Sequence, residues 1–397
     1  MNLKTIITRN IFILSLVSLF ADVASEMLYP VMPIYLKHIG FSIVLIGVLE
    51  GFAEAIAGLS KGYFGKRSDL SGKRLPFVQI GYALSAVSKP MIAMFVYPLW
   101  VFLARSLDRV GKGVRTGARD ALLSDEATQQ TKGRVFGFHR ALDTFGAVIG
   151  PSLALVYLLY RPNDYTTLFY LAFVPGLMAI AFTFLIKEQR RKSAQTDTRH
   201  TLNIFAFIGY WRESPTAYRR LVAGLLLFTL VNSSDVFLLL KIKEAGLSDT
   251  AVIGVYIFYN LVYALFAYPF GGLADKLGMK TVLVIGLVLF AVVYFGMAFA
   301  HTWTAFVVLF LLYGIYAAAT EGVSKAWISN ICAKSQTATA IGTFTAFQSI
   351  AALLASSLAG WIWYAWGASA VFLLSGLVSM SVALYVSRLK YEKISQF

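Results

Sequence analysis

Apolar segments of about 20 residues recur along the whole chain, and they restrict its possible folds more than any other feature. A helix needs about that length to cross ~30 Å of hydrocarbon. The chain has 397 residues, of which 58% are hydrophobic and only 14% are charged. A water-soluble domain does not need so much apolar surface, so the sequence predicts an all-α integral membrane protein.

We expect twelve transmembrane helices in two pseudo-symmetric six-helix bundles. The predicted spans lie near residues 11–36, 43–63, 76–96, 98–121, 136–159, 166–186, 220–242, 251–270, 280–300, 303–326, 338–362 and 368–388. The longest polar stretch separates the sixth span from the seventh. This divides the chain into an N-terminal bundle (1–186), a cytoplasmic linker (187–219) with a short surface helix near Leu202–Trp211, and a C-terminal bundle (220–397).

The positive charge of the chain is distributed as in membrane proteins. The net charge is +15, but the basic residues lie in alternate loops, and the remaining loops contain little beyond Lys37, Arg161 and Lys243. This pattern places both termini in the cytoplasm and argues against nucleic-acid binding. The single cysteine, Cys332, excludes an internal disulfide, and the four histidines show no metal-ligand spacing.

A ten-residue loop occurs twice, 206 positions apart, each time between two long apolar segments. The copies are residues 65–74 (Gly-Lys-Arg-Ser-Asp-Leu-Ser-Gly-Lys-Arg) and 271–280 (Gly-Gly-Leu-Ala-Asp-Lys-Leu-Gly-Met-Lys). Both read Gly-x-x-small-Asp-x-x-Gly-x-basic. The glycines permit a tight turn, and the carboxylates of Asp69 and Asp275 can pair with a base or a helix N-terminus. A repeat at this offset indicates two related halves, which in a membrane favours a transporter.

These segments resemble the major facilitator superfamily. The resemblance covers all twelve spans and is carried mainly by the two loops, of which the second is the closer match. The first departs from the family pattern at Arg67, where the family prefers an apolar residue. Further segments resemble a poorly characterised prokaryotic group of the superfamily: residues 108–115, 134–140, 232–235 and 321–322. The resemblance implies that helices one, four, seven and ten line a central cavity, and that the protein works as a monomer in the bacterial cytoplasmic (inner) membrane.

Ionisable residues inside the spans are costly and mark candidate functional sites. Helix four is the richest: one face, an arc of roughly 120° at 100° per residue, carries Arg105, Asp108, Arg109, Lys112, Arg115 and Arg119. Arg105 and Arg109 are candidate substrate-binding cations; the alternative is a structural pairing with Asp108 or Asp143. Arg115 and Arg119 are expected to pair with Asp69 at the gate.

Acidic residues occur as helical pairs that are candidates for proton coupling. Asp22 with Glu26, and Glu50 with Glu54, each share a helix face at i,i+4 spacing. Two carboxylates held close together do not both stay ionised, so one of them can carry a proton. The alternative for Glu50 and Glu54 is a static ion pair with Arg105 or Arg140.

Further charged residues within predicted spans are Glu321, Lys325, Asp235 and Lys89, besides Arg140, Asp143 and Lys241. Glu321 and Lys325 are assigned to substrate binding, or else satisfy one another at i,i+4. Asp235 is assigned to proton coupling, and it can also bind a cation or pair with Lys241 as an outer gate. Lys89 is interpreted as a lysine that reaches the membrane surface.

The gating residues predicted from these patterns are Asp69, Arg74, Arg115, Arg119, Asp275 and Lys280, together with Gly146, Gly150 and Pro151 in helix five. The last three resemble the first half of the superfamily's antiporter motif, whose second half is missing here. Small residues at this spacing permit close helix packing.

Together these features predict a proton-coupled secondary transporter that moves a small organic solute, most simply an anion, by alternating access. The alternative is a proton-antiport efflux pump for drugs or other lipophilic or cationic solutes. We expect no cofactor other than the proton gradient and no bound metal. An enzyme is disfavoured because the sequence has no nucleophile motif and no ATP-binding loop, and a channel needs no loop repeated in both halves.

Overall fold

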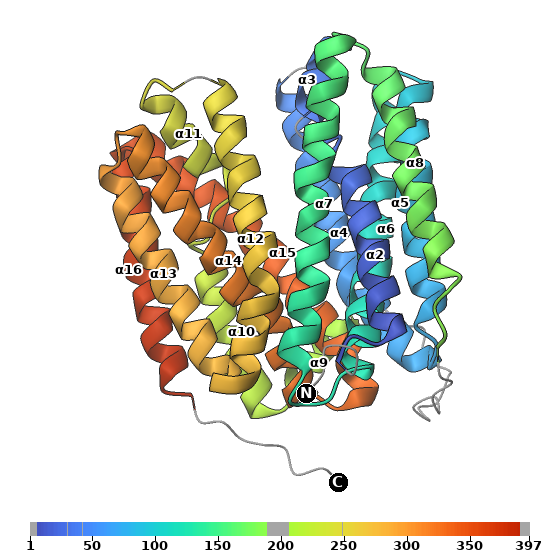
Figure 1. Cartoon of the computed structure of the whole chain (residues 1–397), viewed down its shortest axis with the longest axis vertical. Coiled ribbons are helices and arrows are strands. Elements are labelled where there is room, and N and C mark those ends of the chain that lie inside the picture. The colour runs from blue at the N-terminus through green and yellow to red at the C-terminus, as the bar shows by residue number, and fades with distance from the viewer. Residues whose placement is uncertain (1–5, 30, 42, 189–205, 248, 390–397) are drawn as a thin grey trace. The chain divides into compact units, whose positions relative to one another are not determined.

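The computed structural model describes residues 6–29, 31–41, 43–188, 206–247 and 249–389, and these residues are almost entirely helical (Figure 1). For Glu50 and Glu54 it describes the backbone alone. The helices are α2 (Arg9–Glu26), α3 (Met32–His38), α4 (Ile43–Ser71), α5 (Leu75–Met94), α6 (Pro98–Asp125), α7 (Lys132–Tyr160), α8 (Tyr165–Thr183), α9 (Ala206–Glu213), α10 (Thr216–Thr229), α11 (Val236–Glu244), α12 (Asp249–Leu277), α13 (Met279–Phe299), α14 (Trp303–Ile331), α15 (Thr337–Trp366) and α16 (Ala368–Ser387). The short helix α9 corresponds to the predicted surface helix.

Two predicted spans are interrupted. The first consists of α2 and α3, and the seventh of α10 and α11, whereas we expected continuous helices over 11–36 and 220–242. The sequence has prolines at positions 30 and 33 near the first break, and proline removes a helical hydrogen bond. The second break falls on Asn-Ser-Ser-Asp (232–235), side chains that compete for backbone hydrogen bonds. Counting each interrupted pair as one span, the described helices other than α9 match the twelve predicted spans.

The chain forms two compact units, and each takes one short segment from the other half of the sequence. Unit 1 comprises Met1–Ala127, Leu142–Glu213 and Ala333–Ser349. Unit 2 comprises Thr128–Ala141, Ser214–Cys332 and Ile350–Phe397. The start of α15 therefore belongs to unit 1, and the start of α7 belongs to unit 2.

Unit 1 is built around α6. This helix packs on α4 and α5, while α8 packs on α2 and α5. The approach of α5 to α6 is close because Gly81 and Gly111 face one another: a Cβ placed on Gly111 would lie 2.6 Å from the Gly81 carbonyl oxygen. The charged side chains of α6 are thereby enclosed in helical walls.

Unit 2 has an aromatic core. The helices α12, α13, α14 and α16 pack side by side, with α13 in contact with both α14 and α16 (Figure 1). The rings of Phe290 and Tyr294 on α13 stack at 3.9 Å, and Phe290 also meets Tyr316 of α14.

Seven helices in the described part of the chain are long and apolar enough to cross a membrane: α7, α8, α12 from Gly254 onward, α13, α14, the segment Lys334–Trp366, and α16. Large apolar side chains such as Leu159, Leu265 and Leu377 are exposed on these helices. Such surfaces suit hydrocarbon rather than water, and the chain is an integral membrane protein.

Candidate functional site

The first loop copy holds the start of α15 through Asp69. The Asp69 carboxylate accepts hydrogen bonds from the Thr339 backbone N–H at 2.7 Å and the Thr339 hydroxyl at 2.8 Å. These are among the first donors of α15, which have no partner within the helix, so Asp69 caps that helix and interacts favourably with its dipole.

Arg74 holds this carboxylate in place. Its guanidinium lies 2.9 Å from Asp69, donates to Asp125, and donates to the Lys334 carbonyl at 3.0 Å. Burial alone would lower the pKa of Arg74, but the adjacent carboxylates of Asp125 and Asp69 outweigh it and raise the pKa. We call Asp69, Arg74, Asp125 and Thr339 the Asp69 latch.

The second loop copy caps the N-terminus of α7 through Asp275. The buried Asp275 carboxylate accepts hydrogen bonds from the backbone N–H groups of Gly133 at 2.8 Å and Arg134 at 2.9 Å. We call these three residues the Asp275 latch. Lys280, the counterpart of Arg74, instead donates to the carbonyls of Ser387 and Leu389. The two repeats thus share the carboxylate cap but differ in the role of the basic residue.

The first glycine of each repeat lets its helix pass close to the helix that the latch caps. A Cβ on Gly65 would lie 2.5 Å from the Ala338 carbonyl oxygen of α15, and a Cβ on Gly271 would lie 2.2 Å from the Gly133 carbonyl oxygen of α7. Backbone therefore touches backbone at both crossings.

The predicted glycines of helix five have a similar role within unit 1. A Cβ on Gly146 would lie 2.8 Å from the Asp22 Cβ, and a Cβ on Gly150 would lie 2.7 Å from the Val23 carbonyl oxygen. Pro151 is buried and α7 continues through it. The half-buried acids Asp22 and Glu26 are therefore held against α7.

Lys89 does not reach the membrane surface; that interpretation was wrong. Its ammonium group lies 2.6 Å from the Asp108 carboxylate, and the residue is only 3% exposed. Arg105 lies 3.8 Å from the other Asp108 oxygen. Lys89 of α5 and Arg105 of α6 thus both neutralise the buried Asp108. This favours the alternative in which Arg105 pairs with Asp108 for structural reasons and does not bind substrate. Arg109, one residue further along α6, is half-buried.

Arg115 and Arg119 do not pair with Asp69 as expected. Arg115 stacks on the Tyr82 ring at 4.4 Å and donates to the Ser85 hydroxyl at 2.6 Å. Arg119 pairs with Asp120 at 2.9 Å and with Asp143 at 4.0 Å. Both arginines lie inside unit 1, because the α6 face that carries them turns towards α5, α2 and α7 rather than towards the end of α4.

Glu321 of α14 pairs with Arg140 of α7 rather than with Lys325. The two charged groups lie 3.5 Å apart, with side chains 39% and 30% exposed. The Arg140 guanidinium also donates to the Tyr263 hydroxyl and lies 5.3 Å from that ring. The sequence suggested Arg140 only as a static partner of Glu50 or Glu54, whereas the structure pairs it with Glu321 in a partly exposed ion pair. Lys325 is half-buried one turn further along α14.

Asp235 lies at the second helix break and faces tyrosines. Its carboxylate accepts a hydrogen bond from the Tyr313 hydroxyl at 2.7 Å. The Tyr313 ring lies 5.1 Å from Tyr259 and 5.2 Å from Tyr316. Lys241, the expected outer-gate partner, pairs instead with Glu244 at 3.5 Å.

The remaining predicted acids, Glu50 and Glu54, lie in α4, but their side chains are outside the described residues. Among the described residues no group of three His, Cys, Asp or Glu side chains is arranged to hold a metal ion.

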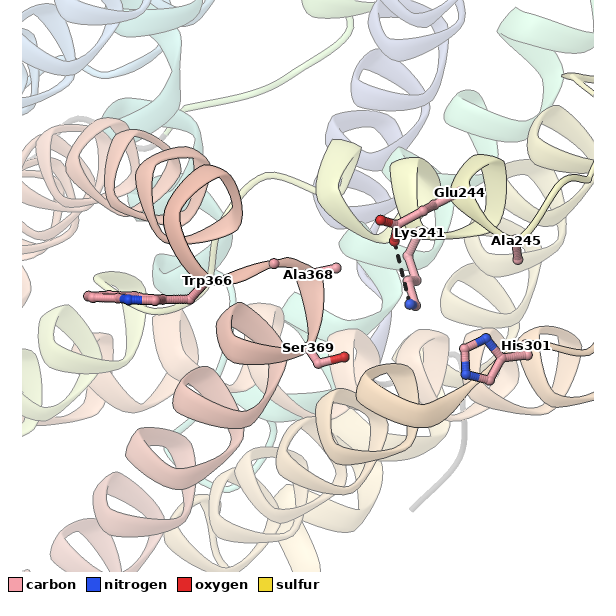
Figure 2. Close-up of a pocket in the computed structure, with 8 residues that line it drawn as sticks. Lys241, Glu244, Ala245, His301, Trp366, Ala368 and Ser369 are labelled. Atoms are coloured by element: carbon pink, nitrogen blue, oxygen red, sulfur yellow. Dashed lines mark hydrogen bonds and ion pairs between the residues drawn. The ribbon is translucent and has the colours of Figure 1, made fainter.

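A pocket of about 320 Å³ opens beyond α11 (Figure 2). It is lined by the Lys241–Glu244 pair, His301, Trp366 and Ser369. Of the residues singled out in the sequence, the pocket includes Lys241, the candidate outer-gate residue, which pairs here with Glu244.

The fold and these buried charges define a helical membrane protein of the transporter type. The sequence model of the Major Facilitator Superfamily matches residues 14–258 and 236–395. The chain therefore belongs to the major facilitator superfamily, which confirms the resemblance and the predicted fold class.

Individual relatives agree with this assignment. The chain is 32% identical over 363 residues to the uncharacterized MFS-type transporter MJ1317 of Methanocaldococcus jannaschii, covering 90% of this chain and 89% of the relative. It is 23% identical over 394 residues to the multidrug resistance protein MdtG of Serratia proteamaculans, covering 95% and 92%. The crystal structure of the human organic anion transporter MFSD10 superposes with a TM-score of 0.82 at 15% identity, covering 95% of this chain and 99% of that chain; at this identity it supports the fold alone.

Proposed function

We propose that this protein is a proton-coupled secondary transporter that moves a small organic anion by alternating access. Membership of a transporter superfamily supports transport rather than an enzymatic activity. The observation that carries the solute class is the partly exposed Arg140 guanidinium, fixed by Glu321 and Tyr263 within the predicted fifth span. A guanidinium so placed can bind a carboxylate or phosphate in two-pronged geometry.

The moving bodies in this proposal are the predicted halves, residues 1–186 and 220–397, joined by the linker 187–219. Each latch connects a carboxylate of one half to a helix N-terminus of the other: Asp69 to Thr339, and Asp275 to Gly133. Release of both latches would be the step that opens the basic end. The positive-inside pattern would place that end in the bacterial cytoplasm with both termini, and the unit of function would be a monomer.

The proposed solute-binding residues of unit 2 are Arg140, Glu321 and Lys325, and Arg109 of unit 1 is a separate candidate. Arg105 is reassigned as a positioning residue, because its side chain is only 9% exposed beside Asp108, whereas that of Arg140 is 30% exposed. Coupling would use the carboxylates of Asp22 and Glu26 on α2, with Glu50, Glu54 and Asp235 as further candidates. Asp22 lies where Gly146 brings α7 against α2, so a change of charge there would act directly on a helix crossing.

A second candidate function is efflux of lipophilic cations. The acidic Asp235 beside the rings of Tyr259, Tyr313 and Tyr316 supports it, because carboxylates and aromatic faces both attract organic cations. The name of the 23% identical relative, a multidrug resistance protein, points the same way.

A ligand screen separates the two candidates. The melting temperature of purified protein would be measured with a panel of small carboxylates, phosphates and lipophilic cations. We expect stabilisation by anions that is lost in Arg140→Gln and in Arg109→Ala. The exposed Arg212 of α9 provides the control, since Arg212→Gln should respond like the unmodified protein. Stabilisation by cations alone, unchanged in both arginine variants, would replace the anion proposal with the efflux one.

A further inference from the structure

The break between α10 and α11 collects oxygen atoms that make no hydrogen bond. Helix α10 ends at Thr229 and α11 begins at Val236. Within the described part of the chain, no donor reaches the carbonyl oxygens of Leu230, Val231, Asn232 and Ser233. Four consecutive carbonyls at the negative end of a half-helix create a region that attracts a cation.

Side-chain oxygens of the same region are also unsatisfied, although they are shielded from solvent. The Ser233 hydroxyl and the Asn232 carbonyl oxygen make no hydrogen bond, and Ser233 is 4% exposed. Asn232 is oriented by its amide nitrogen, which donates to the Tyr316 hydroxyl at 3.1 Å. The fully buried Tyr294 hydroxyl lies beside the hydroxyls of Ser233 and Tyr313 but makes no hydrogen bond of normal geometry with either. Buried polar atoms without partners are rare in proteins, so several together indicate an occupant.

Asp235 supplies the negative charge. Its carboxylate accepts a hydrogen bond from Tyr313 at 2.7 Å and also faces the Tyr259 hydroxyl, and in the described chain it makes no ion pair with a cationic side chain. The titratable groups that face it are Tyr313 and Glu321 of α14, Tyr259 of α12 and Tyr294 of α13. Glu321 already pairs with Arg140, so the half-buried Asp235 carboxylate is the acid near the break that lacks a cationic side chain, and this favours binding of a positive ion.

We propose that the break between α10 and α11 binds a sodium ion through the side chains of Asp235, Asn232 and Ser233 and the carbonyl oxygens of the unwound stretch. Unwound backbone and half-helix C-terminal ends are oxygen donors that transporters use for this ion. One carboxylate among neutral ligands matches a monovalent charge, whereas Ca²⁺ sites combine several carboxylates. The inference rests on the proposed transport function and deepens it: Asp235 carries sodium, while the carboxylates of α2 and α4 carry the proton.

Sodium itself is the probe for the test. The melting temperature of the full-length protein, purified in detergent without solute, would be measured at mildly alkaline pH. Sodium chloride would be replaced by potassium or choline chloride at constant ionic strength. We expect a saturable rise with sodium, as for any ligand that binds the native state alone, a smaller rise with potassium, and none with choline.

Variants locate the effect. Asp235→Asn should abolish the sodium response, and Ser233→Ala should raise the half-saturating sodium concentration by about tenfold or more, the cost of perturbing a metal site. Ser381→Ala is the matched control, because that hydroxyl donates to the Leu377 carbonyl of its own helix; its response should equal that of the unmodified protein. Radioactive sodium binding of one ion per chain provides a second readout if Asp235→Asn fails to fold.

Two outcomes would overturn the proposal: no sodium-specific stabilisation of a well-folded protein, or the same response in both site variants as in the control. The first outcome indicates that water occupies the break. The assay needs neither solute nor gradient, so it is independent of transport. If sodium does not bind but proton-driven solute flux is intact, the sodium site is wrong and the proposed transport function stands. If sodium binds but no solute flux is found, the proposed transport function is wrong and the sodium site stands.

Discussion

Lys89 and Asp108 form an ion pair of 2.6 Å between α5 and α6, with side chains only 4% and 11% exposed. Arg105 approaches the same carboxylate from the next turn of α6. The basic face of α6 is therefore largely a structural network within unit 1. This arrangement gives Arg105 a charged partner inside unit 1.

We predict that Lys89→Met destabilises the protein severely. The variant removes the 2.6 Å partner of a buried carboxylate and leaves Asp108 with the longer 3.8 Å contact to Arg105. Breaking a buried ion pair costs up to about 3–5 kcal/mol. Thermal unfolding in detergent and the monodisperse fraction after size-exclusion chromatography would measure the loss. Lys112→Met changes an exposed lysine of α6 and should have little effect. Equal stability of the two variants would contradict the buried pair.

Asp275→Asn is expected to weaken the Asp275 latch. The amide offers one acceptor oxygen without charge, and loss of a helix cap costs ~1 kcal/mol, or about a fivefold shift in an equilibrium. The single cysteine, Cys332, is buried at the end of α14, which Lys132 of α7 reaches through the Ser329 carbonyl at 2.6 Å. The maleimide labelling rate of Cys332 should therefore rise about fivefold.

Asp164→Asn is the control for that experiment. Asp164 also caps a helix, by accepting from the Thr167 N–H at 3.2 Å, but it does so at the start of α8 in unit 1. Its labelling rate should match that of the unmodified protein. A rate that does not respond to Asp275→Asn would show that the cap does not limit opening at this end.

A glycine pair on one helix tests the crossing of α12 and α7. Gly271→Ala places a methyl group 2.2 Å from the Gly133 carbonyl oxygen, so the backbones must separate, at a cost of about 1–3 kcal/mol. Gly254→Ala lies on the same helix with nothing within 4 Å of the new methyl group, so it should stabilise by ~0.5–1 kcal/mol. Opposite shifts in melting temperature are expected, and shifts of the same sign would contradict the close crossing.

Neutralising the acids of α2 tests proton coupling. In proteoliposomes, Asp22→Asn or Glu26→Gln should reduce solute uptake driven by a pH gradient by about 5- to 150-fold, the usual range of a coupling free energy. Solute exchange without a gradient should persist, because it needs no net proton movement. The exposed Glu213 serves as control through Glu213→Gln. If exchange and driven uptake fall together, the two acids have a structural role instead.

The sequence predicted the helical spans well, because their apolar length is a local property. It did not predict the breaks in the first and seventh spans, since an interruption of a few residues hardly changes the hydropathy of a long window. The surface helix expected near Leu202–Trp211 is described over Ala206–Glu213, and its expected first residues, 202–205, lie outside the described residues.

The site was harder to predict, because it depends on pairings between distant residues. The sequence pattern singled out Asp69 and Asp275, but not that each caps a helix far along the chain. Lys89 was misjudged because its partner lies on a neighbouring helix. Arg140 was visible as a charge within a span, but the i,i+4 spacing of Glu321 and Lys325 drew attention to a local pair rather than to the observed pair of Glu321 with Arg140.

Unit 1 includes a late segment of the chain, Ala333–Ser349, and this affects the order in which the protein can fold during synthesis. Asp69 and Thr339 are 270 positions apart, so the carboxylate is made long before the helix start that it caps. Until the ribosome has produced the beginning of α15, the backbone at Gly65 and the charged groups around Arg74 lack part of their packing. Chains fold largely in the order in which they emerge, but here the earlier unit must wait for a late segment. A nascent chain halted before α15 would therefore present an incomplete polar surface to membrane quality control, even though every span of unit 1 had already been inserted.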